Sequence, residues 1–147
     1  LVSLGKQMWT RGISCWDCHG NMANGKQEDP RSPIGANLRE AGLSVEDVAE
    51  VIRCGRPGTP MPYFGKDAYS GGDACYGMNN DSLRASGLRP GQETLKKRKI
   101  DALAQFIVFT FEGSGEATKE NCQALFGADA SSCNRWPTDA EVSANGK

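Results

Sequence analysis

Apolar residues recur at helical spacing in three stretches of the chain, and longer polar stretches separate them. The first stretch covers residues 1–11. The second lies between Ser44, a favourable N-cap residue, and Gly55, a favourable helix terminator. The third covers residues 93–112, where bulky apolar side chains are interspersed with alanines. This pattern predicts three main helices joined by loops.

The first and third of these helices carry residues suited to a close crossing. Gly5 has no side chain to hold a neighbouring backbone away, and Trp9 lies one turn further along the helix. Ala102 and Ala104 are small positions on the third helix. We expect the two helices to cross at Gly5, with Trp9 either filling the side of a cofactor pocket or serving as an ordinary core aromatic.

Three stretches without helical periodicity lie between or after the helices. Residues 20–37 are polar and rich in turn-forming residues, which predicts a loop. Residues 65–92 resemble an insertion, with several glycines and little periodicity. Residues 114–147 form a polar tail, in which we expect weak order beyond Asp139.

The composition limits the class of protein. The chain has 147 residues, of which 38% are hydrophobic, and a net charge of -1. This length suits one small domain, and the balanced charge argues against a nucleic-acid partner. No apolar run approaches the roughly 20 residues that span a bilayer. The chain starts at Leu1 without a signal sequence, so we expect that an export signal has been removed and that the protein is periplasmic or otherwise exported.

The strongest chemical signal is the motif CWDCHG at residues 15–20. Two cysteines separated by two residues and followed by a histidine form the attachment signature of c-type haem. Cys15 and Cys18 would each add a thiol across one haem vinyl group, since one turn of chain between them matches the vinyl spacing. His19 would then lie beneath the iron as the proximal ligand. The motif predicts one covalently bound haem c.

Because His19 is the only histidine in the chain, a sixth iron ligand must come from methionine, lysine or solvent. Two rival interpretations of the motif are weaker. A thioredoxin-like redox pair needs a neighbouring βαβ pattern, and a structural zinc site needs a second ligand pair at short spacing. The sequence around residues 15–20 offers neither.

The favoured sixth ligand is Met61, in the segment GRPGTPMPYF at residues 55–64. Three prolines fix parts of this backbone and disfavour helix around the methionine, which predicts a stiff, extended strap carrying one thioether. Met78 is the competing ligand, and an open sixth site is the third alternative. Met8 and Met22 are expected to be core or surface residues.

A ligating histidine normally donates its second ring N–H to a fixed acceptor. The backbone carbonyl of Gly35 or Ala36, at the end of the loop that follows the motif, is the candidate acceptor for His19. An ordinary surface turn at this position is the alternative.

Four cysteines remain after the two of the motif, and an even number in an exported protein suggests two disulfides. Of the three possible connectivities we favour the pairs Cys54–Cys75 and Cys122–Cys133, because each closes a local loop in a region poor in core-forming residues. Four buried free thiols are the alternative.

With these features placed, the chain resembles a class I c-type cytochrome. The resemblance rests on the N-terminal helix with its glycine and aromatic, CWDCHG, the capped helix after Ser44, GRPGTPMPYF, and the helix reading IDALAQFIVF. It implies that Cys15 and Cys18 hold the haem and that His19 and Met61 are its axial ligands. The glycine-proline pair usual in that family falls at Gly35-Ala36, where the proline is missing.

The resemblance also implies an all-α, haem-wrapping fold of about three to five helices with long loops, here with extra disulfides. It gives one cytochrome c domain over residues 1–147, with its core at residues 1–64 and 93–113. Residues 65–92 are then an insertion and residues 114–147 a C-terminal tail.

The expected function is one-electron transfer between exported redox enzymes, without catalysis. The expected partners are redox proteins, with a periplasmic dehydrogenase as donor and an oxidase or another cytochrome as acceptor. Two alternatives stay open. The chain is the haem subunit of a larger dehydrogenase complex, or it is a haem enzyme or sensor whose sixth iron position is open.

Overall fold

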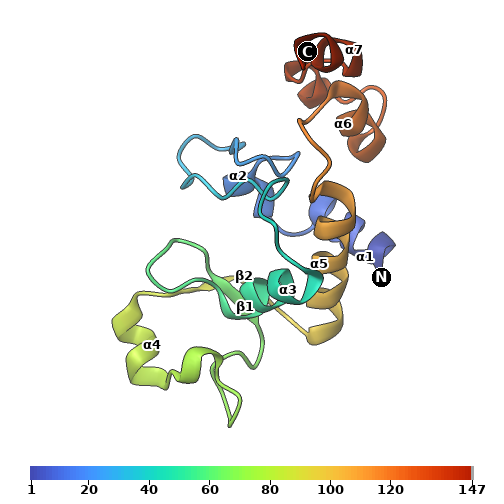
Figure 1. The fold of residues 1–147 in the computed structure, drawn as a ribbon. Helices are drawn as coiled ribbons and strands as arrows, with labels where there is room; N and C mark the ends of the chain where they lie inside the picture. Colours follow the sequence, from blue (N-terminus) through green and yellow to red (C-terminus); the bar gives the residue numbers. More distant parts are fainter. Residues whose placement is uncertain (147) are drawn as a thin grey trace. The chain divides into compact units, whose positions relative to one another are not determined.

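The structure is a computed structural model that describes residues 1–146 (Figure 1). Within these residues the chain forms seven α-helices, two 3-10 helices and one two-stranded sheet, and 48% of the chain is helical. In chain order the elements are α1 (Val2–Arg11), α2 (Cys15–His19), α3 (Val45–Cys54), β1 (Tyr63–Gly65), η1 (Cys75–Gly77), α4 (Asn80–Ser86), β2 (Pro90–Leu95), α5 (Lys97–Phe111), α6 (Lys119–Phe126), η2 (Ser131–Arg135) and α7 (Asp139–Asn145).

The predicted all-α fold of three to five helices is wrong. β1 and β2 pair in parallel, with Tyr63 opposite Pro90 and Gly65 opposite Leu95. β1 has three residues and β2 opens on a proline, so neither strand carries the alternating run by which strands are recognised in a sequence. Four short helices, α2, α4, α6 and α7, add to the three expected long ones.

The chain divides into two compact units. We call Leu1–Gly5 with Leu43–Val108 the Met61 unit, and Lys6–Gly42 with the chain from Phe109 onward the His19 unit. Helices α1 and α5 each contribute residues to both units. The predicted single domain over residues 1–147 stays a prediction.

Two of the predicted main helices form as expected. α1 occupies the first apolar stretch, and α3 begins at a capping box after Ser44. The Asp47 amide donates to the Ser44 hydroxyl at 3.1 Å, and the Ser44 amide donates to the Asp47 carboxylate at 3.0 Å. Gly55 ends α3 in the left-handed region, at φ 67°, which favours glycine.

The third main helix begins later than predicted. α5 starts at Lys97, because the residues before it, up to Leu95, belong to β2. The Lys66 amide donates to the Leu95 carbonyl at 3.0 Å, which extends the contact between the strands. Sequence periodicity alone does not separate the end of this strand from the first turn of the helix.

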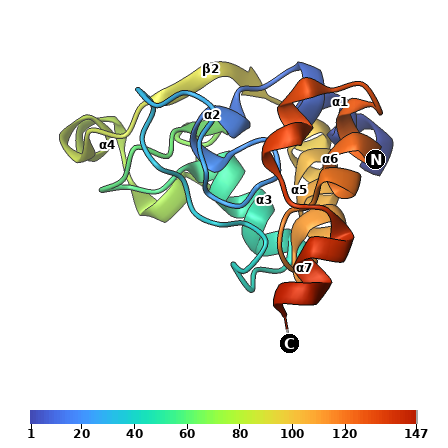
Figure 2. The ribbon, with the colours of Figure 1, turned by 90° about the horizontal axis from the view of Figure 1, so that it is seen from above.

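The insertion at residues 65–92 and the tail are both structured. α4 begins at a capping box formed by Asn79 and Ser82, and α7 begins at one formed by Thr138 and Glu141. The weak order expected beyond Asp139 is therefore wrong within the described residues, since α7 occupies this stretch. Figure 2 shows the tail helices α6 and α7 at the orange-to-red end of the chain.

Both favoured disulfides are present. Cys54 bonds to Cys75 in the Met61 unit, and Cys122 bonds to Cys133 in the His19 unit. The first joins the end of α3 to the insertion, and the second joins α6 to η2. All four sulfur-bearing residues are buried. The alternative of four free thiols is therefore wrong.

In the Met61 unit, α1 crosses α5 at Gly5 as the sequence predicts. A Cβ atom on Gly5 would lie 2.5 Å from the Cβ of Phe106 and closer still to the carbonyl oxygen of Ala102. The two helix backbones therefore approach each other to a distance that only glycine permits.

The first testable prediction concerns this crossing. Gly5→Ala should lower the free energy of unfolding by about 1–3 kcal/mol, because the added methyl group must push the two helices apart. Urea denaturation measures this change. Gly72→Ala is the matched control, since a Cβ at Gly72 meets no atom within 4 Å. Equal midpoints for the two variants would show that the crossing is looser than described.

Candidate functional site

The CWDCHG motif forms the short helix α2 in the His19 unit. Cys15 begins the helix and Cys18 lies one turn later, so the two residues are neighbours on the same face of the helix. Neither cysteine is in a disulfide, and both are partly buried. Gly20 ends the helix at φ 81°, with its amide donating to the Trp16 carbonyl at 2.8 Å.

The two motif thiols are held in the neutral form. Burial raises the pKa of Cys15 to about 12. Burial, and to a smaller degree the neighbouring Asp17 carboxylate, also raise the pKa of Cys18. A cysteine pair that exchanges disulfides needs the opposite environment, because the thiolate is the attacking species. The surroundings of the motif therefore argue against a thioredoxin-like redox pair.

The His19 ring is fixed by a backbone carbonyl. Its Nδ1 lies 2.9 Å from the Ala36 oxygen, which confirms the predicted acceptor even though the neighbouring proline of the family is absent. Since a carbonyl oxygen only accepts, Nδ1 carries the proton and Nε2 keeps a free lone pair. Burial lowers the pKa of His19, which favours this neutral form. The ring therefore presents one unprotonated nitrogen to a ligand.

Backbone hydrogen bonds join the loop after the motif to the motif and to itself. The Gly35 amide donates to the Cys18 carbonyl at 2.8 Å, and the Gly25 amide donates to the His19 carbonyl at 2.8 Å. A Cβ on Gly35 would lie 2.7 Å from His19 Nδ1, so glycine is required there. Further along, the Leu38 amide donates to the Ala23 carbonyl at 2.7 Å. These bonds place the Ala36 carbonyl.

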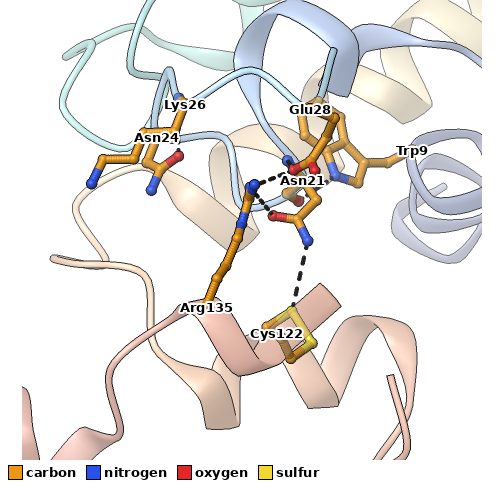
Figure 3. A network of polar contacts seen from close by, with 8 residues as sticks. Trp9, Asn21, Asn24, Lys26, Glu28, Cys122 and Arg135 are labelled. Carbon is orange, nitrogen blue, oxygen red and sulfur yellow. Dashed lines mark hydrogen bonds and ion pairs between the residues drawn. A yellow bond between two sulfur atoms is a disulfide. The ribbon is translucent and has the colours of Figure 1, made fainter. Parts of the chain in front are cut away.

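A polar network joins this loop to the tail (Figure 3). The Arg135 guanidinium donates to the Glu28 carboxylate and, at 3.2 Å, to the side-chain oxygen of Asn21. The Glu28 carboxylate also accepts a hydrogen bond from the backbone amide of Asn21 at 2.8 Å. The Trp9 indole donates to the backbone carbonyl of Asn21 at 3.0 Å. The Asn21 side chain in turn donates to the sulfur of Cys122 at 3.8 Å. Asn21, two residues after His19, is therefore held from several sides.

Two further contacts stabilise the same region. Phe126 of α6 stacks on Trp16 of the motif, with ring centroids 5.7 Å apart. Arg39 is 3% exposed, and its guanidinium donates to the carbonyls of Met22, Gly115 and Glu116. A buried charge is tolerated when its donors are satisfied in this way. Both contacts tie the loop to the chain after α5.

Sequence reasoning did not find the residues of this network. Asn21, Glu28, Arg39 and Arg135 carry no local motif, and the contacts join positions about a hundred residues apart, such as Asn21 and Arg135. Only the even number of cysteines signalled that the tail is attached to anything. Phe126, which lies between the two cysteines of the second disulfide, stacks on Trp16 of the motif.

Met61 belongs to the Met61 unit and is partly buried. Its strap is a closed loop rather than the extended segment predicted, because Pro57 and Gly58 form a turn in which Gly58 has φ 80°. The Arg56 amide donates to the Met61 carbonyl at 3.2 Å, and the Met61 amide donates to the Thr59 hydroxyl at 3.2 Å. Both backbone groups of Met61, its amide and its carbonyl, are thus hydrogen-bonded within the loop.

The strap also folds against its own first residue. A Cβ on Gly55 would lie 2.9 Å from the Met61 oxygen and 2.8 Å from the Pro62 carbonyl carbon. Among the other methionines, Met8 and Met22 are buried in the core, at 7% and 1% exposure, as expected. Met78 directly follows η1 and, like Met61, is partly buried.

The structure thus brings Cys15, Cys18 and His19 together on one helix, and places Met61 in a separate constrained loop. Within residues 1–146 no three His, Cys, Asp or Glu side chains converge as a metal-binding group. A haem iron does not need such a group, since the porphyrin leaves only two axial positions to the protein. The free thiols and the free Nε2 of His19 fit covalently attached haem.

Comparison with known proteins gives no relative on which to base the function. No protein-family model matches the chain, and neither a curated protein nor a solved structure matches it. In the part of the chain that the structure describes, no helix has the length and apolar character needed to cross a membrane. The function must therefore be inferred from the residues themselves.

The second prediction concerns the tail contact. A double-mutant cycle of Arg135→Gln and Glu28→Gln should give a coupling energy of about 0.5–1 kcal/mol, because the pair is only partly exposed and is oriented by Asn21. Chemical denaturation of the four proteins measures it. The control cycle is Arg31 with Asp29, whose arginine side chain is 89% exposed and whose coupling should be smaller. A coupling no larger than the control would show that the tail is not fixed through Arg135.

Proposed function

We propose that the chain is a c-type cytochrome that carries single electrons. The observation that carries this proposal is the hydrogen bond from His19 Nδ1 to the Ala36 carbonyl, 2.9 Å long, beside two free thiols on the same short helix. It leaves Nε2 of the only histidine in the chain unprotonated and orients the ring. A structural histidine would not need this combination with two unpaired cysteines.

Each residue has a defined role in this proposal. Cys15 and Cys18 would hold the haem covalently, and His19, through its Nε2, and Met61, through its sulfur, would bind the iron. When bound, the haem supplies a one-electron redox centre, and methionine ligation raises its potential. Since two protein ligands then occupy both axial positions, no position is left for a substrate. We therefore propose an electron carrier and not an enzyme.

The structure of the strap supports Met61 over Met78 as the second ligand. A thioether is a weak, neutral ligand, so its position must be maintained by the protein. The backbone on both sides of Met61 is hydrogen-bonded, and Gly55 packs against the same backbone. Met78 has one such backbone bond, from its amide to the Cys75 carbonyl at 3.1 Å, and it follows Tyr76 and Gly77, which both have positive φ and are exposed.

We extend the proposal to family, location and partners. The motif, the strap and the helix crossing support a relationship to class I c-type cytochromes. Two disulfides support an exported, oxidising compartment such as the periplasm. An exported electron carrier requires redox proteins on both sides, and we propose a periplasmic dehydrogenase as donor and an oxidase or another cytochrome as acceptor.

The third prediction tests covalent attachment. Protein produced with a cytochrome c maturation system should gain the mass of one haem that survives denaturation, because two thioether bonds resist unfolding. Cys15→Ser combined with Cys18→Ser should lose this mass completely. The control variant, Cys122→Ser with Cys133→Ser, removes the same number of thiols outside the motif and should keep it. Absence of haem from the native protein under these conditions would refute the proposed function.

The fourth prediction tests the sixth ligand. The oxidised protein should show the far-red charge-transfer band of methionine bound to ferric haem. Met61→Ala should abolish this band, and the matched variant Met78→Ala should retain it. If the native protein is instead high-spin and binds carbon monoxide readily, the sixth position is open, and the haem enzyme or sensor alternative replaces the carrier.

A further inference from the structure

Three interactions join the insertion to the junction between α3 and the Met61 strap. The Tyr69 hydroxyl donates to the Cys54 carbonyl at 2.6 Å, and the Tyr76 hydroxyl donates to the Gly55 carbonyl at 2.8 Å. The Cys54–Cys75 disulfide bonds the same turn covalently. The insertion is therefore attached to the place where α3 ends and the strap begins.

These two carbonyls belong to a part of a helix that needs external partners. The last carbonyls of a helix have no hydrogen-bond donor within the helix. Cys54 is the last residue of α3 and Gly55 follows it, and here two tyrosines supply the missing donors. Burial raises the pKa of Tyr69 to about 12, so its hydroxyl remains a donor at any physiological pH.

Tyr76 adopts an unusual conformation to make its contact. Its φ is 58°, in the left-handed region that bulky residues seldom occupy. Burial does not explain this backbone, because Tyr76 is 52% exposed. Such conformations persist where the surroundings impose them, and they concentrate at functional positions. Here the disulfide at Cys75 and the hydrogen bond to Gly55 impose it.

The far end of the strap is held by the same insertion. The Tyr63 amide, two residues after Met61, donates to the Arg89 carbonyl at 3.1 Å, where β1 pairs with β2. The Tyr63 ring contacts the Tyr69 ring, with centroids 4.9 Å apart. At the opposite end, just before the strap begins, the Arg53 guanidinium donates to the Asp73 carbonyl of the insertion at 3.0 Å. Both ends of the loop that carries Met61 are thus attached to one segment.

We propose that the insertion at residues 65–92 is a clamp that positions Met61 for ligation, with Tyr69 and Tyr76 as its positioning residues and the Cys54–Cys75 disulfide as its fixed joint. This inference rests on the proposed function. A thioether competes poorly with stronger ligands once its loop can open, because the apparent affinity of a competitor rises with the population of the open state. The clamp keeps that population low.

The experiment compares three alterations of the clamp with two matched controls. The altered proteins are Tyr69→Phe, Tyr76→Phe and the double variant Cys54→Ser with Cys75→Ser. Tyr63→Phe removes the same hydroxyl group within the same cluster, and Cys122→Ser with Cys133→Ser removes the other disulfide. Each full-length holoprotein is examined by amide hydrogen exchange at Arg56 and Tyr63 and by titration of the ferric protein with imidazole.

Tyr69→Phe and Tyr76→Phe should each show about tenfold faster exchange at these two amides, the effect of one lost hydrogen bond of typical strength. The variant without the Cys54–Cys75 disulfide should show at least the same increase, because it loses a covalent link to the same turn. Imidazole, which displaces the sixth ligand, should bind about tenfold more tightly for the same reason. Tyr63→Phe should match the native protein in both measurements, and loss of the Cys122–Cys133 disulfide, which lies in the other unit, should leave exchange at Arg56 and Tyr63 unchanged. A role in general stability alone would lower the unfolding midpoint without changing imidazole affinity.

Failure of this inference differs from failure of the proposed function. If the native protein shows the methionine band and the altered proteins exchange and bind imidazole as the controls do, the clamp is refuted and the electron carrier stands. If exchange accelerates but imidazole affinity does not change, the insertion supports the loop without positioning Met61, which also refutes the inference. A native protein without covalent haem refutes both the function and the ligand-positioning role.

Discussion

The arrangement of the candidate site depends on one hydrogen bond, from His19 Nδ1 to the Ala36 carbonyl. Because a carbonyl can only accept, this bond determines which ring nitrogen carries the proton and therefore which one can bind a metal. The carbonyl is placed by the backbone of its own loop, through the Gly35 amide on Cys18, and by the missing side chain at Gly35. A proline next to Gly35 would stiffen the loop, but backbone hydrogen bonding places the acceptor without it. The orientation of the His19 ring is thus determined by backbone atoms and by the absence of a side chain at Gly35.

The tail contributes to the same constraint from outside the loop. Arg135, Phe126 and Cys122 each contact a residue between Trp16 and Glu28, which is the part of the chain that contains the motif and the turn after it. Part of this network is nearly inaccessible to solvent, since Asn21 is 2% exposed. A buried amide with unsatisfied hydrogen bonds would be costly, so the network favours the single arrangement in which Trp9, Glu28 and Arg135 all meet it. The tail is therefore part of the framework of the site and not a separate appendage.

The sequence was informative where the signal is local. The capping box at Ser44, the close approach at Gly5, the acceptor at Ala36 and both disulfides follow from neighbouring residues or from short loops, and the structure confirms them. The two strands are too short and irregular to show an alternating pattern, so the fold class was wrong. The helices α4 and α7 did have a usable signal, because Asn79 with Ser82 and Thr138 with Glu141 have the spacing of capping boxes. The contacts of Asn21 with Arg135 depend on tertiary structure and leave no trace in local sequence.

The two candidate ligands are held by the same physical means in separate units. His19 ends helix α2 beside a loop that is hydrogen-bonded back to it, and Met61 lies in a short loop closed by backbone hydrogen bonds. In each case a glycine is packed where no side chain would fit: Gly35 in one unit and Gly55 in the other. In each unit an additional disulfide-bonded segment contacts this region from outside. In the His19 unit it is the tail, which the Cys122–Cys133 bond closes, and in the Met61 unit it is the insertion, which the Cys54–Cys75 bond joins to α3. A chain with a single histidine has no second imidazole to replace a displaced ligand. On the proposed function, the contacts of the tail and of the insertion would hold His19 and Met61 in place and so favour one coordination state.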